Sequence, residues 1–257
     1  MKRIIKTPCL PENNVASVLI SSDYPDLSDA LLNKFNISTI QVQRNNALTD
    51  DIASHPDCAF IQLNDIIAIA DKTVYENIVN YLTIEGNEAK FSLYKSSETI
   101  SSPYPGDIRL NVRVISDMIL CNTKYIDETI QDFADKYCYR LIHCNQGYVA
   151  CSTVLLNNNA LITDDETIHR SAQKNAIDSI LIKKGSVKLK GRNYGFIGGT
   201  CGMIGKNLLA FTGNLDTHSD AELIKSFLKK HSVDYIELND GPLMDIGGII
   251  PFSEYIQ

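Results

Sequence analysis

Two of the seven cysteines stand in sequence settings that suit nucleophilic chemistry, because a thiolate attacks carbon readily once its pKa is lowered. Cys201 lies in the stretch GFIGGTCGMIG, and Cys151 lies in YVACS. The glycine-rich stretch has neither the G-x-G-x-x-G spacing of a dinucleotide-binding loop nor the Lys-Ser/Thr of a phosphate loop. It also lacks the second glycine that frames a nucleophile on a strained turn. Both cysteines are candidate catalytic residues, and the alternative is that each is a small buried hydrophobe.

Three aspartates near glycines form a second group of candidates. Asp107 and Asp240 are each adjacent to a glycine, and Asp245 interrupts an apolar strand two residues before Gly247. Carboxylates gathered at the mouth of a channel would attract a cation, so we expect these three to bind a cationic ligand. Aspartate is also an ordinary turn residue beside glycine, and that alternative stays open.

The sequence predicts no metal site and indicates no cofactor. The five histidines offer no pair at metal-ligand spacing, and no two cysteines stand in C-x-x-C spacing. Seven cysteines are an odd number, which argues against a disulfide framework and favours reduced thiols.

Composition narrows the class of protein. The chain has 257 residues, 44% of them hydrophobic, and a formal net charge of −7 without any basic cluster. We therefore expect a globular protein with a sizeable core that binds no nucleic acid. No apolar run approaches the roughly 18 residues that span a bilayer, and the N-terminal MKRIIK is not followed by an apolar signal segment. The prediction is a cytoplasmic protein without a membrane partner.

The elements that must position these residues recur along the chain with a period of roughly 45 residues. Each unit has an apolar strand, a polar turn, a second strand, an amphipathic helix and a third strand. Acidic caps precede the helices, at Asp71, Asp127, Asp165 and Asp220. The units cover about residues 14–44 plus 241–252, 56–95, 106–143, 147–183 and 194–238, and we number them one to five in that order.

The two ends of the chain complete one unit. The N-terminal part has a strand, a helix and a strand, and the C-terminal DIGGIIPF has a strand with no helix after it. Joining them gives a closed ring of five units, which leaves no sheet edge unpaired at the seam. The sequence thus predicts an α/β fold, a five-bladed propeller of ββαβ repeats, in a single domain over residues 1–257.

Alignment of the units places five small residues at equivalent points of the predicted first strands. They are Cys58, Asn111, Cys151, Cys201 and Gly247. One interpretation is that small residues are required where five backbones converge. The other is that Cys151 or Cys201 faces a central channel as a nucleophile.

Five ββαβ units closed head to tail resemble the pentein family of guanidine-group-modifying enzymes over nearly the whole chain. The stretches NQGYVACS, NYGFIGGTCGMI and LNDGPLMDIGGIIP are most similar to an uncharacterised bacterial family of that fold. The resemblance implies a cysteine in a C-x-[ST]-x-P pattern, a histidine in an H-x-D-T pattern and a carboxylate in a G-G-D stretch. The cysteine would attack a guanidinium carbon, the histidine would transfer protons and the carboxylates would hold the cation.

Residue by residue, the resemblance places other residues at all three positions. Gly247 stands at the cysteine, Tyr148 at the histidine and Asn111, after Arg109 in RLNV, at the aspartate. We expect Arg109, Asn111 and Tyr148 to bind the ligand together with the three aspartates.

Three functional hypotheses follow. The first is a catalytically degenerate pentein that binds a small cationic or amino-acid-like ligand in the channel. The second is an active cysteine-dependent hydrolase or amidinotransferase that uses Cys151 or Cys201 on a guanidino or amidine-like substrate. The third is a non-enzymatic scaffold for protein interaction. The sequence predicts no oligomeric state.

Overall fold

The computed structural model describes residues 1–86 and 90–256, which form a mixed α/β fold of small sheets and helices. The helices of this part of the chain are α1 Pro25–Phe35, α2 Pro56–Ala59, α3 Lys72–Ile84, α4 Glu128–Tyr137, α5 Glu166–Lys174 and α6 Ala221–Lys230, with 3-10 turns η1 Ile197–Thr200 and η2 Leu215–Thr217. None of the described helices is both long enough and apolar enough to cross a bilayer.

Four three-stranded sheets follow one another along the chain, and all have the same topology. Their strands, in sheet order, are β4 Phe60–Gln62, β5 Ile67–Ala70 and β6 Ser92–Lys95; β7 Arg113–Ile115, β8 Met118–Cys121 and β9 Arg140–His143; β10 Thr153–Asn157, β11 Ala160–Thr163 and β12 Asp178–Leu181; β13 Cys201–Gly205, β14 Leu208–Phe211 and β15 Asp234–Glu237. In each sheet the first two strands pair antiparallel and the last two pair parallel. A helix connects the second strand of each sheet to the third. This is the strand–strand–helix–strand unit that the repeat predicts.

The fifth sheet joins the two ends of the chain. It has four strands in the order β1 Lys2–Ile4, β16 Ile250–Tyr255, β2 Val15–Ser21 and β3 Ser38–Val42. The last strand is antiparallel to both neighbours, with Ile250 opposite Leu19 and Lys2 opposite Tyr255. The C-terminal strand therefore completes the first unit as expected, and β1 adds a strand that the sequence did not predict.

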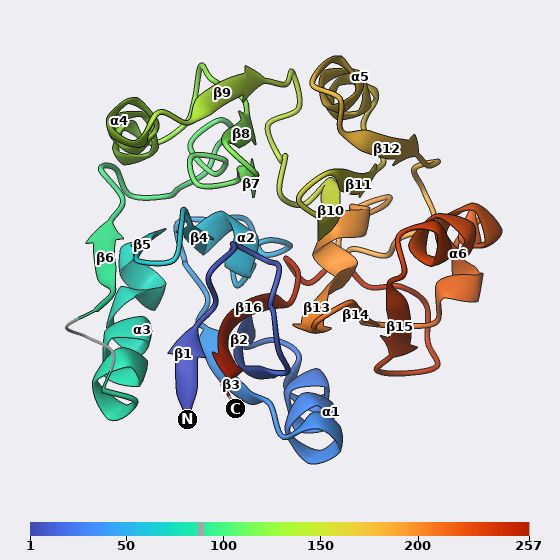
Figure 1. The fold of residues 1–257 in the computed structure, drawn as a ribbon, viewed down its shortest axis with the longest axis horizontal. Helices are drawn as coiled ribbons and strands as arrows, with labels where there is room; N and C mark the ends of the chain where they lie inside the picture. Colours follow the sequence, from blue (N-terminus) through green and yellow to red (C-terminus); the bar gives the residue numbers. More distant parts are fainter. Residues whose placement is uncertain (87–89, 257) are drawn as a thin grey trace.

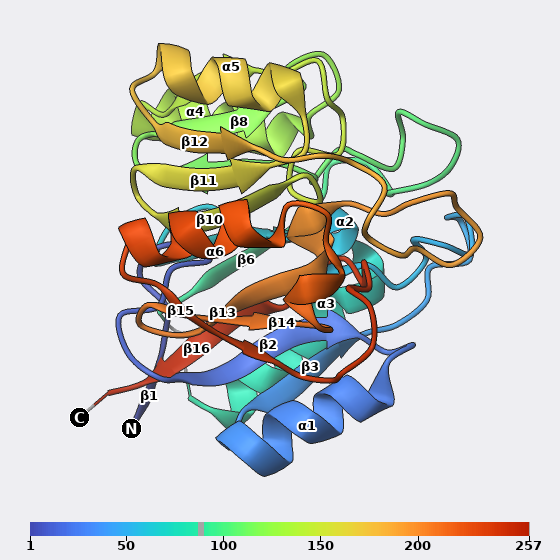
Figure 2. The ribbon, with the colours of Figure 1, turned by 90° about the vertical axis from the view of Figure 1, so that its right-hand side faces the viewer.

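The helices surround the sheets. Figure 1 shows α1, α3, α4, α5 and α6 at the outside and β4, β7, β10, β13 and β16 nearer the centre. The sheets are separate and the described strands form no closed sheet, so the five-bladed propeller remains an interpretation. Figure 2 shows the two chain ends on one side of the molecule, while long loops project from the other side.

Helix starts follow the predicted caps in three cases. Asp71, Asp127 and Asp165 each accept a hydrogen bond from the backbone N–H two residues later, at 3.1, 3.0 and 2.9 Å. Such caps satisfy N–H groups that the first helical turn leaves free. Asp220 occupies the corresponding place before α6 but makes no capping hydrogen bond there. Its carboxylate instead accepts from the backbone N–H of Lys183 at 2.7 Å.

The hydrophobic core lies mainly between consecutive units. One cluster packs Val154 and Ile162 of the fourth unit against Met203, Phe211 and Phe227 of the fifth. Another cluster combines β4 and β5 with β7, β8 and α4 in the same way. Because each sheet packs against its neighbours, the segments that precede the first strands are brought together near the centre of the molecule.

Candidate functional site

Three of the five equivalent small residues, Cys58, Asn111 and Cys151, meet as the repeat predicts, and these three lie before their strands rather than on them. Cys58 is in α2, and Asn111 and Cys151 are in the turns that precede β7 and β10. The Asn111 side-chain amide donates to the Asp57 carbonyl at 3.1 Å and lies 3.2 Å from Cys151 Sγ and 3.8 Å from Cys58 Sγ. Its oxygen accepts from the backbone N–H of Ala150 at 2.7 Å. Asn111 therefore ties the second, third and fourth units together.

A pocket of about 310 Å³ opens beside this junction. It is lined by Asp51, Ile52, His55, Tyr148, Cys151, Leu189, Arg192, Asn193, Tyr194, Phe196 and Asp245. Residues 189–194 come from one of the loops that project on the side away from the chain ends (Figure 2). The pocket thus has a floor built by the junction of the units and a rim built by loops.

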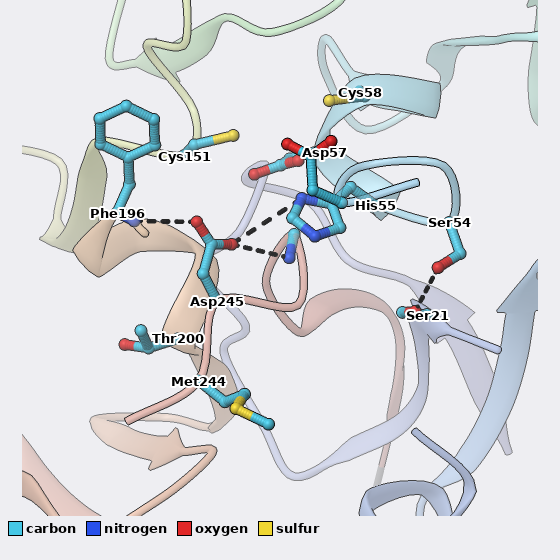
Figure 3. Close-up of polar contacts among 12 residues, drawn as sticks. Ser21, Ser54, His55, Asp57, Cys58, Cys151, Phe196, Thr200, Met244 and Asp245 are labelled. Carbon is cyan, nitrogen blue, oxygen red and sulfur yellow. Dashed lines mark hydrogen bonds and ion pairs between the residues drawn. The ribbon is translucent and has the colours of Figure 1, made fainter. Parts of the chain in front are cut away.

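Three side chains with reactive groups converge beside this pocket, and two of them, His55 and Cys151, line it. His55 lies just before α2, Asp57 lies in its first turn and Cys151 lies before β10. One nitrogen, one oxygen and the sulfur of these residues lie within 4.8 Å of one another, and all three residues are buried (Figure 3). We call His55, Asp57 and Cys151 the floor triad.

Asp57 is the most unusual member of the floor triad. Its side chain is buried, and neither carboxylate oxygen has a hydrogen-bond partner among the described residues. Burial raises its pKa to about 6, and the neighbouring carboxylate of Asp245 acts in the same direction. A buried carboxylate without donors is costly to keep charged, so this group is suited to meet a cation or a hydrogen-bond donor.

Asp245 lies beside the floor triad, on the segment before β16. Its carboxylate accepts from the backbone N–H groups of Phe196 at 2.8 Å and Gly247 at 3.1 Å. One oxygen lies 3.8 Å from Nδ1 of His55 (Figure 3). Burial raises the pKa of Asp245, while His55 and the two N–H donors favour its ionised form. The carboxylate thus lies next to the imidazole, at a distance longer than a hydrogen bond.

Cys151 is a thiol in the free protein. Burial raises its pKa well above the usual value, and the Cys58 thiol and the Asp57 carboxylate add to the effect. Cys151 as a residue is 2% exposed, although it lines the pocket. A nucleophile in such a setting needs a positive charge close by before its thiolate form is accessible.

One wall of the pocket is aromatic and the rim carries an ion pair. Tyr148 donates its hydroxyl hydrogen to Asp107 at 2.7 Å, and its ring stacks on Phe196 with centroids 5.9 Å apart. Burial and the Asp107 carboxylate raise the pKa of Tyr148. At the rim, Arg192 pairs with Asp51 at 2.6 Å.

The remaining predicted site residues lie elsewhere. Cys201 begins β13 and packs in the hydrophobic core, where burial raises its pKa to about 12. Arg109 pairs with Glu98 and is not among the residues that line the pocket. Asp240 is an exposed residue between β15 and β16. The structure thus brings together Asp107, Asn111, Tyr148, Cys151 and Asp245, but not Cys201, Arg109 or Asp240.

The position at which the resemblance placed a cysteine has no room for a side chain. Gly247 has φ +78°, and a Cβ built on it would lie 2.5 Å from Cβ of His55. Real Cβ atoms do not approach another atom so closely. His55 therefore fills the space that a side chain at residue 247 would need.

Sequence reasoning missed His55 and Asp57. A signal was present, because residues 55–58 read His-Pro-Asp-Cys, which matches the H-x-D part of the histidine pattern. The pattern lies at the start of the second unit, whereas the alignment with the enzymes directed attention to the fourth unit at Tyr148. The proline after His55 also made the segment look like an ordinary loop.

Several solved structures to which this chain is similar carry the names of enzymes. Agmatine deiminase from C. jejuni is 12% identical, with 93% of this chain and 90% of that chain covered at a TM-score of 0.56. DDAH from Pseudomonas aeruginosa is 9% identical, with 95% and 100% covered at 0.55. An inosamine-phosphate amidinotransferase from Streptomyces griseus is 11% identical, with 96% and 94% covered at 0.52. At these identities the likeness shows the fold, and it is the pentein fold.

A family model describes the chain more closely. The model of a family of unknown function, DUF6873, matches residues 19–250, and the chain belongs to that family. No curated protein matches the chain significantly.

Proposed function

We propose that this protein is a cysteine-dependent enzyme that acts on a small guanidino or amidino cation. Cys151 is the nucleophile and His55 transfers protons. The observation that carries the proposal is the floor triad: a thiol, an imidazole and an unpartnered buried carboxylate within 4.8 Å of one another beside an open pocket. Nucleophile–base contacts of this kind are often longer before substrate binds.

The charge of the pocket favours a cation. Asp51 and Asp245 line it, and Asp57 lies next to the lining residues His55 and Cys151. Arg192 is the one lysine or arginine among the lining residues and already pairs with Asp51. A planar guanidinium presents several N–H donors, which match the two free oxygens of Asp57. The cation would also lower the pKa of Cys151, because its charge lies next to the sulfur.

The chemical steps then follow from the positions of the groups. The Cys151 thiol loses its proton to His55, and the sulfur forms a bond to the central carbon of the cation. The bond from that carbon to one nitrogen breaks, and His55 returns the proton to the departing amine. Water, or an acceptor amine in a transferase, attacks the same carbon and gives a proton to His55. The carbon–sulfur bond breaks, and the proton passes from His55 to the departing sulfur, which restores the thiol.

The site can be interpreted as the pentein site moved by two units around the ring. The resemblance places the histidine position at Tyr148 in the fourth unit and the cysteine position at Gly247 in the first, two units further on. In this protein His55, at the start of the second unit, takes the histidine position. Cys151, in the fourth unit, takes the cysteine position, and the step from histidine to cysteine is again two units. This interpretation treats the five sheets as blades of a propeller with a common axis.

The moved site also accounts for a carboxylate. The aspartate position of the pattern is Asn111 in the third unit, and two units back around the ring is the first unit. Asp245 lies there, close to the equivalent point. In this interpretation the thiol, the imidazole and the carboxylate keep the order around the ring that the pentein pattern has, and each is shifted by two units.

A second candidate is ligand binding without catalysis. The raised pKa of Cys151 and the changes at Gly247 and Tyr148 favour it. In that case the pocket binds the same cation and the thiol stays unreacted. We also infer a cytoplasmic location, which the seven free cysteines support.

The two candidates separate in a labelling experiment. The probes are a haloacetamidine, which carries a positive charge, and the matched neutral haloacetamide. We expect the amidine to label one site, Cys151, much faster than the amide does, as measured by intact-protein and peptide mass spectrometry. Cys201→Ser should react like the wild type, and Cys151→Ser should lose the label.

Equal rates for the two probes, or amidine labelling at another cysteine, would refute the assignment of Cys151. A panel of guanidino compounds then tests turnover. Protection of Cys151 from the amidine without release of amine or urea-type product supports the binding candidate instead.

A further inference from the structure

We propose that the floor triad of His55, Asp57 and Cys151 is also a zinc site, and that zinc competes there with the organic cation. The metal binding does not depend on the proposed function, whereas the competition does. A thiolate sulfur, an imidazole nitrogen and a carboxylate oxygen are each common zinc ligands. Mixed sulfur and nitrogen donors favour zinc over magnesium or calcium, which prefer oxygen alone.

The geometry is close to that of a site before metal entry. The three donor atoms lie within 4.8 Å of one another. Zinc bonds of about 2.0–2.3 Å in a tetrahedral arrangement hold donor atoms roughly 3.5 Å apart. The donor atoms must therefore approach one another by at most about 1.3 Å. Side-chain rotations can close this gap, because the three side chains come from two separate segments of the chain that face each other (Figure 3).

A second, independent observation points to a ligand at the same place. Both oxygens of Asp57 and Nδ1 of His55 are buried without a hydrogen-bond partner among the described residues. Buried polar groups in proteins are nearly always satisfied by a partner, a water molecule or an ion. A divalent cation bound to the floor triad would satisfy Asp57.

The surroundings supply the other features of a zinc site. The pocket of about 310 Å³ gives the ion a path to the floor triad and leaves room for a water molecule as a fourth ligand. Asp245 lies 3.8 Å from His55 Nδ1 and adds a second buried carboxylate close to the ion. Asn111 contacts the Cys151 sulfur at 3.2 Å and fixes its position.

Binding of zinc would block the chemistry of the same site. The Cys151 thiol releases its proton to solvent when the sulfur–zinc bond forms, and its lone pair is then no longer free to attack carbon. The metal also takes the oxygens of Asp57 that the organic cation needs. Zinc and a guanidino ligand therefore exclude each other.

Cobalt(II) provides the direct test, because it takes zinc sites and reports thiolate ligation by a charge-transfer absorption band. The full-length protein, freed of metal with a chelator, is titrated with Co²⁺ and then with Zn²⁺. We expect one Co²⁺ per chain, a thiolate band and a tetrahedral visible spectrum, both removed by one equivalent of Zn²⁺. Zn²⁺ should also raise the melting temperature of the wild type.

Variants assign the ligands. Cys151→Ser should lose the thiolate band, and Cys201→Ser should keep it. Asp57→Asn and His55→Ala should weaken binding by more than about 100-fold, beyond the effect of losing an outer-shell contact. Melting curves without metal show whether each variant is folded. Binding without a thiolate band, or a folded Cys151→Ser that binds like the wild type, overturns the proposal.

The zinc site and the enzyme proposal fail separately. If Co²⁺ binds with a thiolate band but the amidine shows no preference for Cys151, the metal site stands and the enzyme proposal does not. If the amidine labels Cys151 but Co²⁺ gives no thiolate band, the reverse holds. Where both hold, Zn²⁺ should stop amidine labelling, and failure to do so refutes the competition.

Discussion

Substitution of Gly247 by alanine tests whether the pentein cysteine position is closed in this protein. Gly247 has φ +78°, and the added Cβ would lie 2.5 Å from Cβ and 2.6 Å from Cα of His55. The backbone of the same residue is also engaged, because its carbonyl accepts from the N–H of Asp57 at 3.2 Å. The methyl group can enter only if the segment that carries His55 moves.

Two costs add up in this substitution. A residue with a Cβ in the left-handed region costs about 1–2 kcal/mol. Forcing an extra methyl group into a packed interior costs about 1–3 kcal/mol more. We therefore expect Gly247→Ala to lower the free energy of unfolding by roughly 2–5 kcal/mol, and to slow amidine labelling of Cys151 because His55 is displaced.

Gly191 provides a matched control. It has φ +79°, and a Cβ built there would meet no atom within 4 Å. Gly191→Ala should therefore show the backbone cost alone, about 1–2 kcal/mol. Urea unfolding at equilibrium measures both variants. Equal losses in the two variants would refute the steric conflict with His55 and reopen residue 247 as a position for a side chain.

Three further predictions concern buried polar groups. Burial raises the pKa of Asp164 from 3.8 to about 7. The stabilising contribution of this group is therefore full below pH 4 and is lost as pH rises through 7. Asp164→Asn should flatten this part of the curve of unfolding free energy against pH, by at most about 4 kcal/mol in urea titrations. Asn111→Ala should cost about 2–4 kcal/mol, because the N–H of Ala150 loses its acceptor and a cavity forms; a loss below about 0.5 kcal/mol would contradict its role at the junction. Tyr148→Phe leaves Asp107 without a described hydrogen-bond donor and should cost about 1–3 kcal/mol in thermal or urea unfolding; an unchanged stability would show that water replaces the hydroxyl.

The recurring unit could be predicted because its signals are local. Alternating apolar residues, turn residues and the caps at Asp71, Asp127 and Asp165 each act within a few residues. The C-terminal strand could be assigned to the first unit because that unit lacked one. The strand β1 Lys2–Ile4 could not, because it is short and owes its conformation to pairing with β16.

The positions of the small residues show where local reasoning stops. Cys58 and Cys151 were expected on strands, but the strands begin two residues later, at Phe60 and Thr153. The apolar pattern that marks a strand is continuous through these residues, so it gives no sharp beginning. Cys201 does begin a strand, and its side chain packs between two units instead of facing the pocket.

The sequence by itself determined the elements of this protein, their order in the repeat and the excess of carboxylates over cations. Only the tertiary structure decided which cysteine lies next to an imidazole and a carboxylate. Cys151, His55 and Asp245 lie in parts of the chain about a hundred residues apart. The repeat predicts that their segments are equivalent, but it does not say which of their side chains contact one another. They meet because each sheet packs against the next, and because a glycine at residue 247 leaves the space that His55 occupies.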